Sequence, residues 1–212
     1  RSLVGSEMCI RDSRPAVSGR VRLLGRDVTH LPTLDRWRLG LGYVPAERTE
    51  VASVAALSLV ENTGLNYHFD PEFCPRGMLD RTRLERLTRQ ILATFRVKAP
   101  HPYVRAQHLS GGNLQKLVLG RVLSRQPRLL VAHLPTQGLD VEAAAFVRAQ
   151  LLEAKARGAA VLLISEDLDE IFAVSDRVGA LYEGRFVALV PRNEVDPETV
   201  GAWMAGSLGR RA

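Results

Sequence analysis

Hydrophobic positions follow a helical period in the middle of the chain. In the segment 79–97 the apolar residues recur three to four positions apart: Leu79, Leu84, Leu87, Ile91, Leu92 and Phe95. This spacing places them on one face of a helix, so the pattern predicts a long amphipathic helix. We expect it to form part of a helical block that runs to about Arg125.

From Arg128 onward the pattern changes, and short apolar runs alternate with helical stretches. We expect strands at 129–132, 160–164, 178–182 and 186–190, and helices at 141–156, 168–174 and 197–205. Gly158 ends the first of these helices, and Pro197 fits the first turn of the last one. Strands that alternate with helices predict an α/β fold with a parallel sheet covered on its faces.

The residue pattern in the N-terminal third of the chain predicts shorter helices and strands. Residues 19–29 alternate like a half-buried strand with a Gly turn, and residues 39–48 form a second strand that Pro45 closes. A short helix is expected between them at 33–39. Farther on, Ser58 is followed three positions later by a glutamate, which is the capping-box spacing and predicts a helix at 58–65.

The first thirteen residues, RSLVGSEMCIRDS, show no hydrophobic periodicity. They also lack the charged start, apolar middle and small-residue cleavage site of a signal peptide. Because the string resembles a translated sequencing adaptor, we expect residues 1–13 to be a non-native leader. A frayed natural terminus is the alternative interpretation.

Composition and charge narrow the classes of function only a little. The 212 residues are 46% hydrophobic and 25% charged, which is ordinary for a globular domain. No apolar run approaches the roughly 18 residues needed to cross a bilayer, so a membrane role would require a partner. Cys9 and Cys74 lie far apart, which indicates neither a disulfide framework nor a zinc site and fits a reducing cytosol. The net charge of +6 comes mostly from arginines interspersed with acids, which favours a solvated helix face over nucleic-acid binding.

The strongest local motif is LSGGNLQK at 109–116, directly before an apolar helical stretch. Ser110 can cap that helix, while Gly111 and Gly112 let backbone N–H groups approach an anion at the positive end of the helix dipole. Taken alone, the same residues also fit a plain cap and turn.

The order of motifs downstream adds to this signal. LSGGN is followed by a strand, by PTQGLD, by a helix and by a strand that ends in LLISEDLDE. This order resembles the nucleotide-binding domain of ABC-type ATPases, and the resemblance covers about residues 15–207. It identifies LSGGN as the signature motif, the strand before PT as Walker B and GLD as the D-loop. The resemblance therefore implies these nucleotide-binding residues: Ser110, Gly111, Gly112, Gln115 and Asp140. Asp140 also fits the N-cap of the helix that begins at Val141.

Finer features resemble one branch of that family. GYVPAER at 42–48 is similar to the GYVPEDR segment of simple-sugar and nucleoside importers, whose ATPase is one chain with two nucleotide-binding halves. LSLVENTGL resembles their MSVAENLAL, and SEDLDEIFAVSDRVGALYEGR resembles the second half of the basic-membrane-protein-type nucleoside importers, where VGAWMAGS also matches the end of the chain. The resemblance implies the C-terminal half of such a tandem ATPase.

The implied architecture is a partial ABC-type P-loop NTPase domain. It comprises a RecA-like parallel sheet, an inserted helical subdomain and a piece of the antiparallel β subdomain. The expected boundaries are 1–13 for the leader, 14–57 for the β piece with the Q-loop region, 58–125 for the helical subdomain ending in the signature helix, and 126–212 for the RecA-like portion with the C-terminal helix.

The sequence departs from the family at the positions that carry the chemistry. Where the family places Asp and then Glu, this chain has His133 and Leu134. Leucine neither accepts a proton nor orients water, and loss of a general base typically costs roughly 10²- to 10⁴-fold in rate. No second ligand lies at zinc spacing from His133, which favours a packed or partly exposed histidine over a metal ligand.

Two further motifs depart as well. The switch histidine is replaced by Glu166, and the Q-loop glutamine by Ala46, or by Glu47 if the register shifts by one. The sequence contains no G-x-x-x-x-G-K-[ST] loop, so we expect a chain that starts after its Walker A or is without one.

These observations lead to one functional hypothesis and two alternatives. The hypothesis is an ATP-binding, energy-coupling fragment of an ABC importer for sugars or nucleosides that offers its signature motif to ATP and Mg²⁺ held by a partner half. It is expected not to hydrolyse ATP alone, and to act at the cytoplasmic face of the membrane with the other nucleotide-binding half, permease subunits and, indirectly, a solute-binding protein. The alternatives are a non-catalytic ABC-type regulatory module and a soluble ABC ATPase acting on nucleic acid or ribosomes. The latter predicts coiled-coil insertions or a basic linker, and the sequence has neither.

Overall fold

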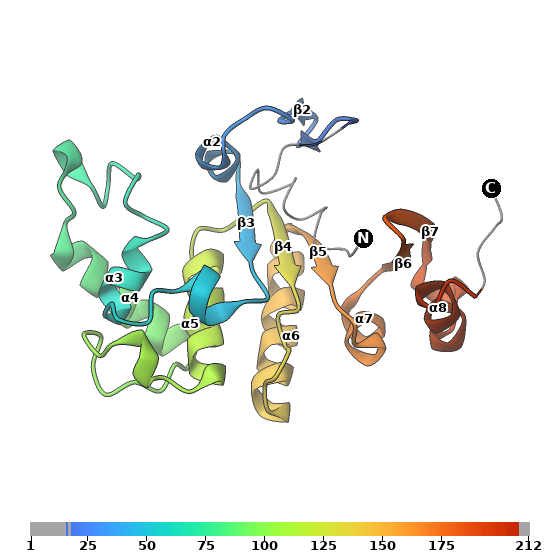
Figure 1. Ribbon diagram of the computed structural model, residues 1–212. Coiled ribbons are helices and arrows are strands. Elements are labelled where there is room, and N and C mark those ends of the chain that lie inside the picture. Colours follow the sequence, from blue (N-terminus) through green and yellow to red (C-terminus); the bar gives the residue numbers. More distant parts are fainter. Residues whose placement is uncertain (1–15, 17, 208–212) are drawn as a thin grey trace. The chain divides into compact units, whose positions relative to one another are not determined.

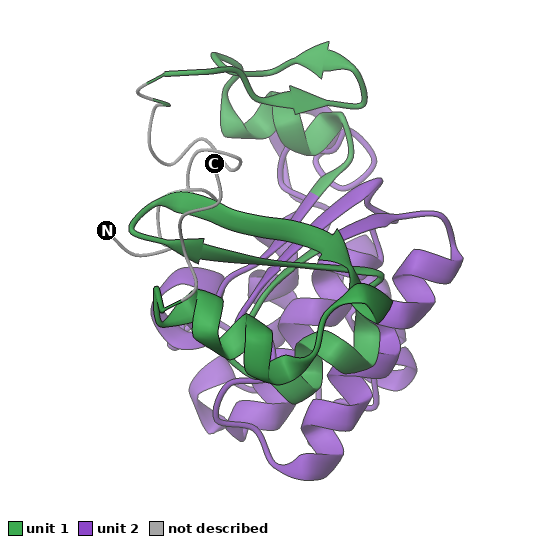
Figure 2. Cartoon of the chain, turned by 90° about the vertical axis from the view of Figure 1, so that its right-hand side faces the viewer, with its two compact units in different colours: residues 1–41, 162–212 green, residues 42–161 purple. Residues whose placement is uncertain are grey.

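The fold is described from a computed structural model, which covers residue 16 and residues 18–207 (Figure 1). The expected leader at 1–13 lies outside the described residues. The chain divides into two compact units, one formed by residues 42–161 and the other by residues 1–41 and 162–212 (Figure 2).

The unit at 42–161 carries most of the helices. Its elements in chain order are β3 (Leu41–Val44), the π-helical turn η2 (Arg48–Ala52), α3 (Leu59–Gly64), the short 3-10 turn η3 (Pro75–Gly77), α4 (Arg81–Thr94), the 3-10 turn η4 (Ala106–His108), α5 (Gly111–Leu123), β4 (Leu129–His133), α6 (Val141–Ala156) and β5 (Ala160–Ile164). The boundary between the two units runs through β5.

The other unit is built from the two ends of the chain. Its elements are β1 (Arg22–Leu23), β2 (Arg26–Asp27), α2 (Thr33–Arg38), α7 (Leu168–Val174), β6 (Arg177–Tyr182), β7 (Arg185–Pro191), the 3-10 turn η5 (Arg192–Glu194) and α8 (Pro197–Met204).

A three-stranded sheet with the order β3-β4-β5 confirms the predicted α/β class. Its strands run in the same direction, and α5 and α6 lie beside it (Figure 1). The central strand β4 is apolar on both faces, because Leu130, Val131 and Ala132 are all at most 1% exposed. Continuous apolar strands of this kind are typical of parallel sheets covered by helices.

The helices α4 and α5 approach each other closely at Gly120 of α5. A Cβ atom on Gly120 would lie 2.7 Å from Ile91 Cγ2 and 2.7 Å from Phe95 Cδ2, so only glycine fits this contact. Ile91 and Phe95 come from the periodic apolar face of α4, and both are buried. The predicted amphipathic helix is confirmed, although it begins later than Leu79, because the side chain of Asp80 caps it at the backbone N–H of Arg83.

The capping box predicted at Ser58 is confirmed. The backbone N–H of Glu61 donates to the Ser58 hydroxyl oxygen at 3.2 Å, and the backbone N–H of Ser58 donates to the Glu61 carboxylate at 2.8 Å. The Ser58 hydroxyl, followed by the Ser58 backbone N–H, lowers the pKa of Glu61 below its ordinary value of 4.5. Helix α3 therefore starts where the local sequence specifies.

The side chain of Asn62 then fixes the loop that leads into α3. Asn62 is fully buried, and its Oδ1 accepts the backbone N–H of Val54 at 2.8 Å. Its Nδ2 donates to the backbone carbonyls of Val54, Leu57 and Ser58 at 3.0, 3.2 and 3.0 Å. One amide thus binds four backbone groups of this segment, whose three carbonyls also accept backbone N–H groups from Leu57, Ala106 and Asn62.

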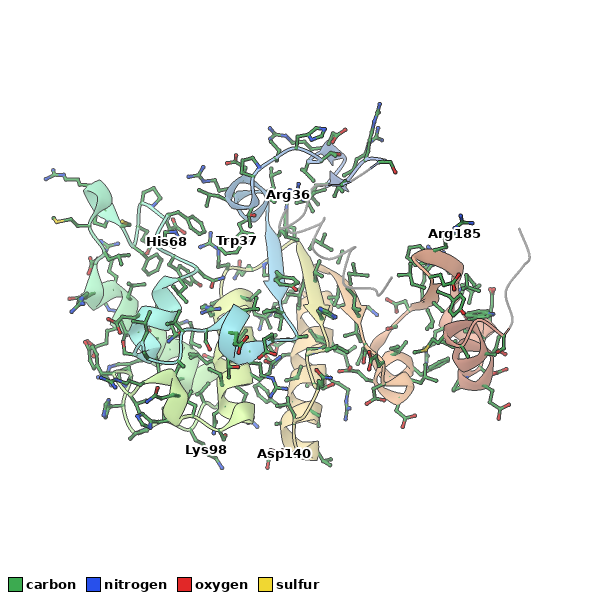
Figure 3. All side chains as sticks on the ribbon, viewed as in Figure 1. Arg36, Trp37, His68, Lys98, Asp140 and Arg185 are labelled. Atoms are coloured by element: carbon green, nitrogen blue, oxygen red, sulfur yellow. The ribbon has the colours of Figure 1, made fainter. Side chains whose placement is uncertain are left out.

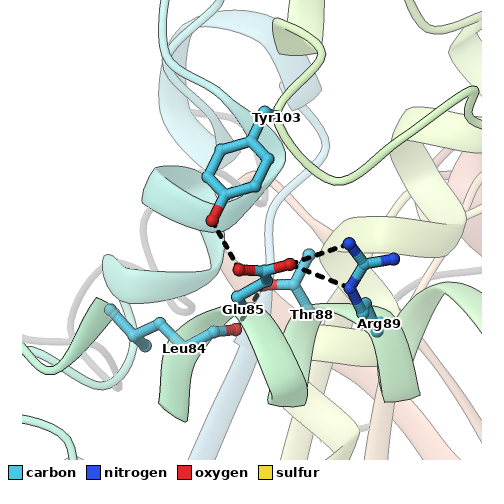
Figure 4. A network of polar contacts seen from close by, with 5 residues as sticks. All are labelled: Leu84, Glu85, Thr88, Arg89 and Tyr103. Carbon is cyan, nitrogen blue, oxygen red and sulfur yellow. Dashed lines mark hydrogen bonds and ion pairs between the residues drawn. The ribbon is translucent and has the colours of Figure 1, made fainter. Parts of the chain in front are cut away.

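The arginine-rich face of α4 is partly neutralised by neighbouring acids. Glu85 accepts two hydrogen bonds from Arg89, at 2.9 and 2.8 Å, and one from the Tyr103 hydroxyl at 2.5 Å (Figure 4). The Tyr103 hydroxyl first, and Arg89 second, hold the pKa of Glu85 below its ordinary value. Arg83 pairs with Asp80 in the same way. These pairs are typical of a solvated helix face.

In the other unit, residues 19–29 form a hairpin, which confirms the predicted Gly turn and divides the predicted strand into two short strands. Leu24 and Gly25 adopt positive φ values of 52° and 79°, and this tight turn reverses the chain so that β1 and β2 pair antiparallel. Arg36 of α2 is 1% exposed, and its guanidinium donates to the carbonyls of Leu31 at 2.8 Å and Thr29 at 3.1 Å (Figure 3). The hairpin is thereby fixed to α2 within this unit.

The C-terminal strands and helix match the sequence pattern. Strands β6 and β7 pair antiparallel around a turn at Glu183 and Gly184, and α8 begins at Pro197 with the Asp196 side chain as its cap. Among the helices that the structure describes, none combines the length and the hydropathy required to span a bilayer.

Candidate functional site

The signature segment lies at the N-terminus of α5, as predicted. Ser110 is the N-cap: its hydroxyl oxygen accepts the backbone N–H of Asn113 at 3.4 Å and the Asn113 side-chain amide at 2.9 Å. Asn113 Oδ1 in turn accepts the backbone N–H of Lys98 at 2.8 Å. Ser110 and Gly111 are exposed, so the positive end of a helix of 13 residues faces solvent.

Asp140 lies beside this segment, and Figure 3 shows it at the start of α6. Its Oδ1 accepts the backbone N–H of Ala143 at 2.7 Å, which confirms the N-cap role. A Cβ atom on Gly112 would lie 3.3 Å from Ala143 Cβ and 3.8 Å from Asp140 Oδ2. The structure therefore brings together Gly112 of the signature segment and Asp140 of the predicted D-loop, both within the unit at 42–161.

Gln115 occupies a different environment from the other predicted binding residues. It is fully buried, and its Nε2 donates to the carbonyl of Pro135 at 2.7 Å. Its Oε1 is also buried and has no hydrogen-bond donor among the described residues. The side chain ties α5 to the turn that follows β4, and a contact with nucleotide stays a prediction for this residue.

The two residues at the end of β4 carry no carboxylate side chain. His133 is the last residue of the strand and Leu134 follows it in the turn, and both are half-buried. Leu134 has a φ of 46°, a left-handed conformation that costs a residue with a Cβ atom roughly 1–2 kcal/mol. The strained turn is present although the side chain at this position cannot act as a base.

The described residues also offer little to a divalent cation. They contain no group of three or more His, Cys, Asp and Glu side chains placed to hold a metal ion. Mg²⁺ prefers oxygen ligands in an octahedral arrangement, and a histidine followed by a leucine supplies none. The residues at the end of β4 therefore do not fit a magnesium site of this chain's own.

The segment after β3 contains the two candidates for the Q-loop position. Ala46 is half-buried, and Glu47 is exposed, with its Oε1 accepting the Thr49 hydroxyl at 2.9 Å. The chain then enters the π-helical turn η2 at Arg48. Which of the two positions replaces the glutamine stays a prediction.

Arg121 holds the η2 turn against the signature helix. This residue of α5 is 5% exposed and donates from Nη2 to the carbonyl of Ala52 at 2.5 Å and from Nη1 to the carbonyl of Asn62 at 2.7 Å. Burial lowers its pKa to about 10. The signature helix, η2 and α3 are thus joined through one buried guanidinium.

Glu166, predicted at the switch position, lies in the other unit. It is exposed and follows β5 in a bend. The neighbouring Ser165 hydroxyl donates to the buried Glu170 carboxylate at 2.7 Å and accepts the backbone N–H of Asp167 at 3.1 Å. These contacts fix the backbone on both sides of Glu166, and its functional role stays a prediction.

Three residues near the signature segment escaped the sequence analysis: Arg48, Asn113 and Arg121. Arg48 and Asn113 lie within the quoted motifs GYVPAER and LSGGNLQK, but their contacts reach residues far away in the chain. Arg121 is an arginine inside an apolar helical run, and that is the one signal that could have drawn attention to it.

Known proteins with similar sequences include import ATP-binding proteins. The chain is 35% identical over 199 residues to the guanosine import ATP-binding protein NupO of Bacillus subtilis (strain 168), which covers 94% of the chain and 39% of that protein. It is 33% identical over 189 residues to the nucleoside import ATP-binding protein NupA of Lactococcus lactis subsp. cremoris (strain MG1363), with 89% and 37% covered. It is also 33% identical over 195 residues to the ribose import ATP-binding protein RbsA 1 of Burkholderia thailandensis, with 92% and 38% covered. The chain thus spans less than half the length of these relatives.

Solved structures and a family match agree with this result. A nucleotide-free ATP-binding cassette from an ABC transporter superimposes with a TM-score of 0.75 at 21% identity, covering 92% of this chain and 81% of that one. The ATP-binding cassette MJ1267 of an ABC transporter gives a TM-score of 0.74 at 20% identity, covering 97% and 82%. Both likenesses establish the fold. The family described as ABC transporter matches residues 7–137, more than half of the sequence. The chain therefore belongs to the ABC transporter family.

Proposed function

We propose that this chain is the ATP-binding, energy-coupling part of an importer for sugars or nucleosides, and that it offers its signature segment to ATP and Mg²⁺ held by a partner half. The proposed class of solute follows the relatives, which are ATP-binding proteins for the import of guanosine, nucleosides and ribose. In this proposal the chain acts at the cytoplasmic face of the membrane.

The observation that carries the proposal is a contrast within one unit. The positive end of α5 is exposed at Ser110 and Gly111, with Asp140 beside Gly112. The end of β4, where a catalytic carboxylate and a magnesium ligand belong, carries Leu134 and His133 instead. A surface suited to a phosphate is thus present where the groups that would activate water are not.

Each residue of the signature segment has a defined task in this proposal. Ser110 fixes the first turn of α5 through its cap, and Gly111 keeps the helix terminus open to an incoming anion because it has no side chain. ATP supplies the phosphoanhydride bond whose cleavage drives transport. Asp140 would connect this segment with the partner half, and its exposure next to Gly112 supports that role.

The permease is proposed to dock on the region 46–65. Three exposed apolar residues support this choice: Val51, Val54 and Leu65 are 53%, 44% and 36% exposed. Arg121 links the same region to α5, so a movement of the docked permease would be transmitted to this helix. A solute-binding protein would act indirectly, through the permease.

A chimeric ATPase tests the proposal. This chain would replace the matched 199-residue segment of the Bacillus subtilis guanosine import ATP-binding protein, and ATP turnover would be measured in the purified chimera. We expect turnover that Ser110→Arg abolishes, because a bulky cation would fill the exposed helix terminus. Leu134→Ala is the matched control and should leave the rate within about twofold, since leucine performs no proton transfer. Unchanged turnover in the Ser110→Arg chimera would contradict the proposal.

A further inference from the structure

The Arg48 guanidinium lies close to the two loops that flank the exposed end of α5. A Cβ atom on Gly111 would lie 3.2 Å from Arg48 Nη1, and a Cβ atom on Gly138 would lie 3.7 Å from Arg48 Nη2. Gly111 is the first residue of α5, and Gly138 belongs to the turn after β4, where its φ is 64°. A single guanidinium therefore lies against both the signature segment and the D-loop.

The charge of this guanidinium is only partly balanced by the protein around it. Arg48 is half-buried, and burial lowers its pKa below the ordinary value. Within the part of the chain that the structure describes, no carboxylate forms an ion pair with it. The charge of the adjacent Glu47 opposes the effect of burial on this pKa, but the Glu47 carboxylate accepts the Thr49 hydroxyl and forms no ion pair with Arg48. Asp140 uses Oδ1 to cap α6.

The position of Arg48 makes this imbalance more pronounced. The N-terminus of a helix carries a partial positive charge, so a cation beside Gly111 is repelled by α5 rather than stabilised. Partly desolvated positive groups that converge in this way are stabilised by an anion that bridges them. The arrangement is therefore suited to an anionic group that arrives from outside the chain.

The backbone that carries Arg48 is held in place from both sides. The Ser53 hydroxyl donates to the Arg48 carbonyl at 2.7 Å, and Arg121 of α5 donates to the carbonyl of Ala52 at the other end of η2. Both anchors, Ser53 and Arg121, are buried. The guanidinium is thus presented by a fixed π-helical turn, a type of element often found at functional sites.

We propose that Arg48 is a phosphate-binding residue of the signature surface, with its guanidinium donating to the terminal phosphate of the nucleotide that the partner half holds. This inference rests on the proposed function and adds to it a cation that the signature motif itself does not contain. Arginine suits the task because its planar group donates to two phosphate oxygens at once. Because its guanidinium also lies close to Gly138, Arg48 would make the D-loop sensitive to the phosphate.

Titration of the whole chain with linear tripolyphosphate tests this inference directly. The ¹⁵N-labelled protein would be followed by NMR at the amide signals of Gly111 and Gly112 and at the Nε–Hε signal of Arg48, with sodium chloride at matched ionic strength as the reference. We expect these signals to shift together with one dissociation constant. Arg48→Gln should weaken that constant by roughly three- to tenfold, the range expected for losing one solvent-accessible charge-assisted contact.

Two further variants separate a bound phosphate from a general charge effect. Arg48→Lys keeps the charge without the planar fork and should fall between the wild type and Arg48→Gln. Arg86→Gln removes the same charge from an exposed position of α4 and should leave the constant within about twofold.

Each other outcome overturns a defined part of the account. Equal binding at Gly111 in the wild type and Arg48→Gln would refute the role of Arg48 while leaving the proposed function intact. Equal weakening by Arg48→Gln and Arg86→Gln would refute it too, because the effect would then be one of net charge. Absence of any shift at Gly111 and Gly112 would count against both the role of Arg48 and the proposed signature surface.

Discussion

Replacing Asn62 with alanine should destabilise the unit at 42–161 substantially. The side chain forms four hydrogen bonds to backbone groups of Val54, Leu57 and Ser58, and it is fully buried. Because the amide has two N–H protons for its three carbonyl partners, the four contacts count as about three full bonds. At roughly 0.5–1.5 kcal/mol net for each bond, they contribute about 1.5–4.5 kcal/mol. Val54 is 44% exposed, and water can reach its backbone groups once the amide is gone. We therefore expect a loss in the lower part of that range, about 1.5–3 kcal/mol.

Two companion variants test whether the lost hydrogen bonds cause the loss of stability in Asn62→Ala. Asn66→Ala makes the same chemical change just after α3, at a half-buried position, and should cost under about 1 kcal/mol. Asn62→Asp keeps an acceptor for the Val54 N–H but turns a carboxylate oxygen toward three carbonyls. It should be at least as unstable as Asn62→Ala at pH 7 and should recover as the pH falls and the carboxylate gains a proton.

The assay is urea-induced unfolding followed by circular dichroism. The urea concentrations at the midpoint of unfolding are compared between variants whose unfolding free energies depend equally steeply on urea concentration. A free energy of unfolding for Asn62→Ala within about 0.5 kcal/mol of the wild type would refute the reasoning, because surface substitutions alone produce effects of that size. A recovery of Asn62→Asp at alkaline rather than acidic pH would refute it as well.

Two other predictions concern the helices of the same unit. Ser58→Ala should cost about 1 kcal/mol at pH 7 through loss of the cap of α3, measured by the same unfolding assay. Because the folded-state pKa of Glu61 is lowered, its share of the capping box is present above its ordinary pKa of 4.5 and is lost as the pH falls through the folded pKa. The cost of Ser58→Ala should therefore be smaller at pH 3 than at pH 7, and a larger cost at pH 3 would contradict this. Gly120→Ala should lower thermal stability, because its Cβ would lie 2.7 Å from Phe95 and overpacking costs roughly 1–3 kcal/mol, against about 1 kcal/mol gained in helix propensity. Adding Phe95→Leu should recover part of that loss. If stability does not recover, the loss has a cause other than the steric overlap between the new Cβ atom and the Phe95 ring.

The sequence predicted the elements whose signals are local. Strand β5 was expected at 160–164 and lies there, and the capping box at Ser58 forms as its spacing indicates. Ser110 and Asp140 were both expected to cap helices, and both do. Each of these signals lies within one helical turn or one strand, so it does not depend on tertiary contacts with distant segments.

The features that escaped prediction depend on contacts between distant segments. Nothing in GYVPAER shows that Arg48 reaches Gly111 and Gly138, because that contact requires η2 to pack on α5. Arg121 acts through the same packing, since its partners are backbone carbonyls, which have no sequence signature. The pattern at 19–29 predicted a strand with a Gly turn, but alternation alone does not show that the segments on either side of the turn pair with each other.

The most direct test of the central claim is the steady-state ATP turnover of the purified chain alone with Mg²⁺. The account predicts no turnover above that of the buffer, and no change on His133→Ala, because the end of β4 supplies neither a base nor a magnesium ligand. Turnover by the isolated wild-type chain that His133→Ala abolishes would show that the chemistry resides in this chain after all, and would contradict the proposed sharing of the site between two halves.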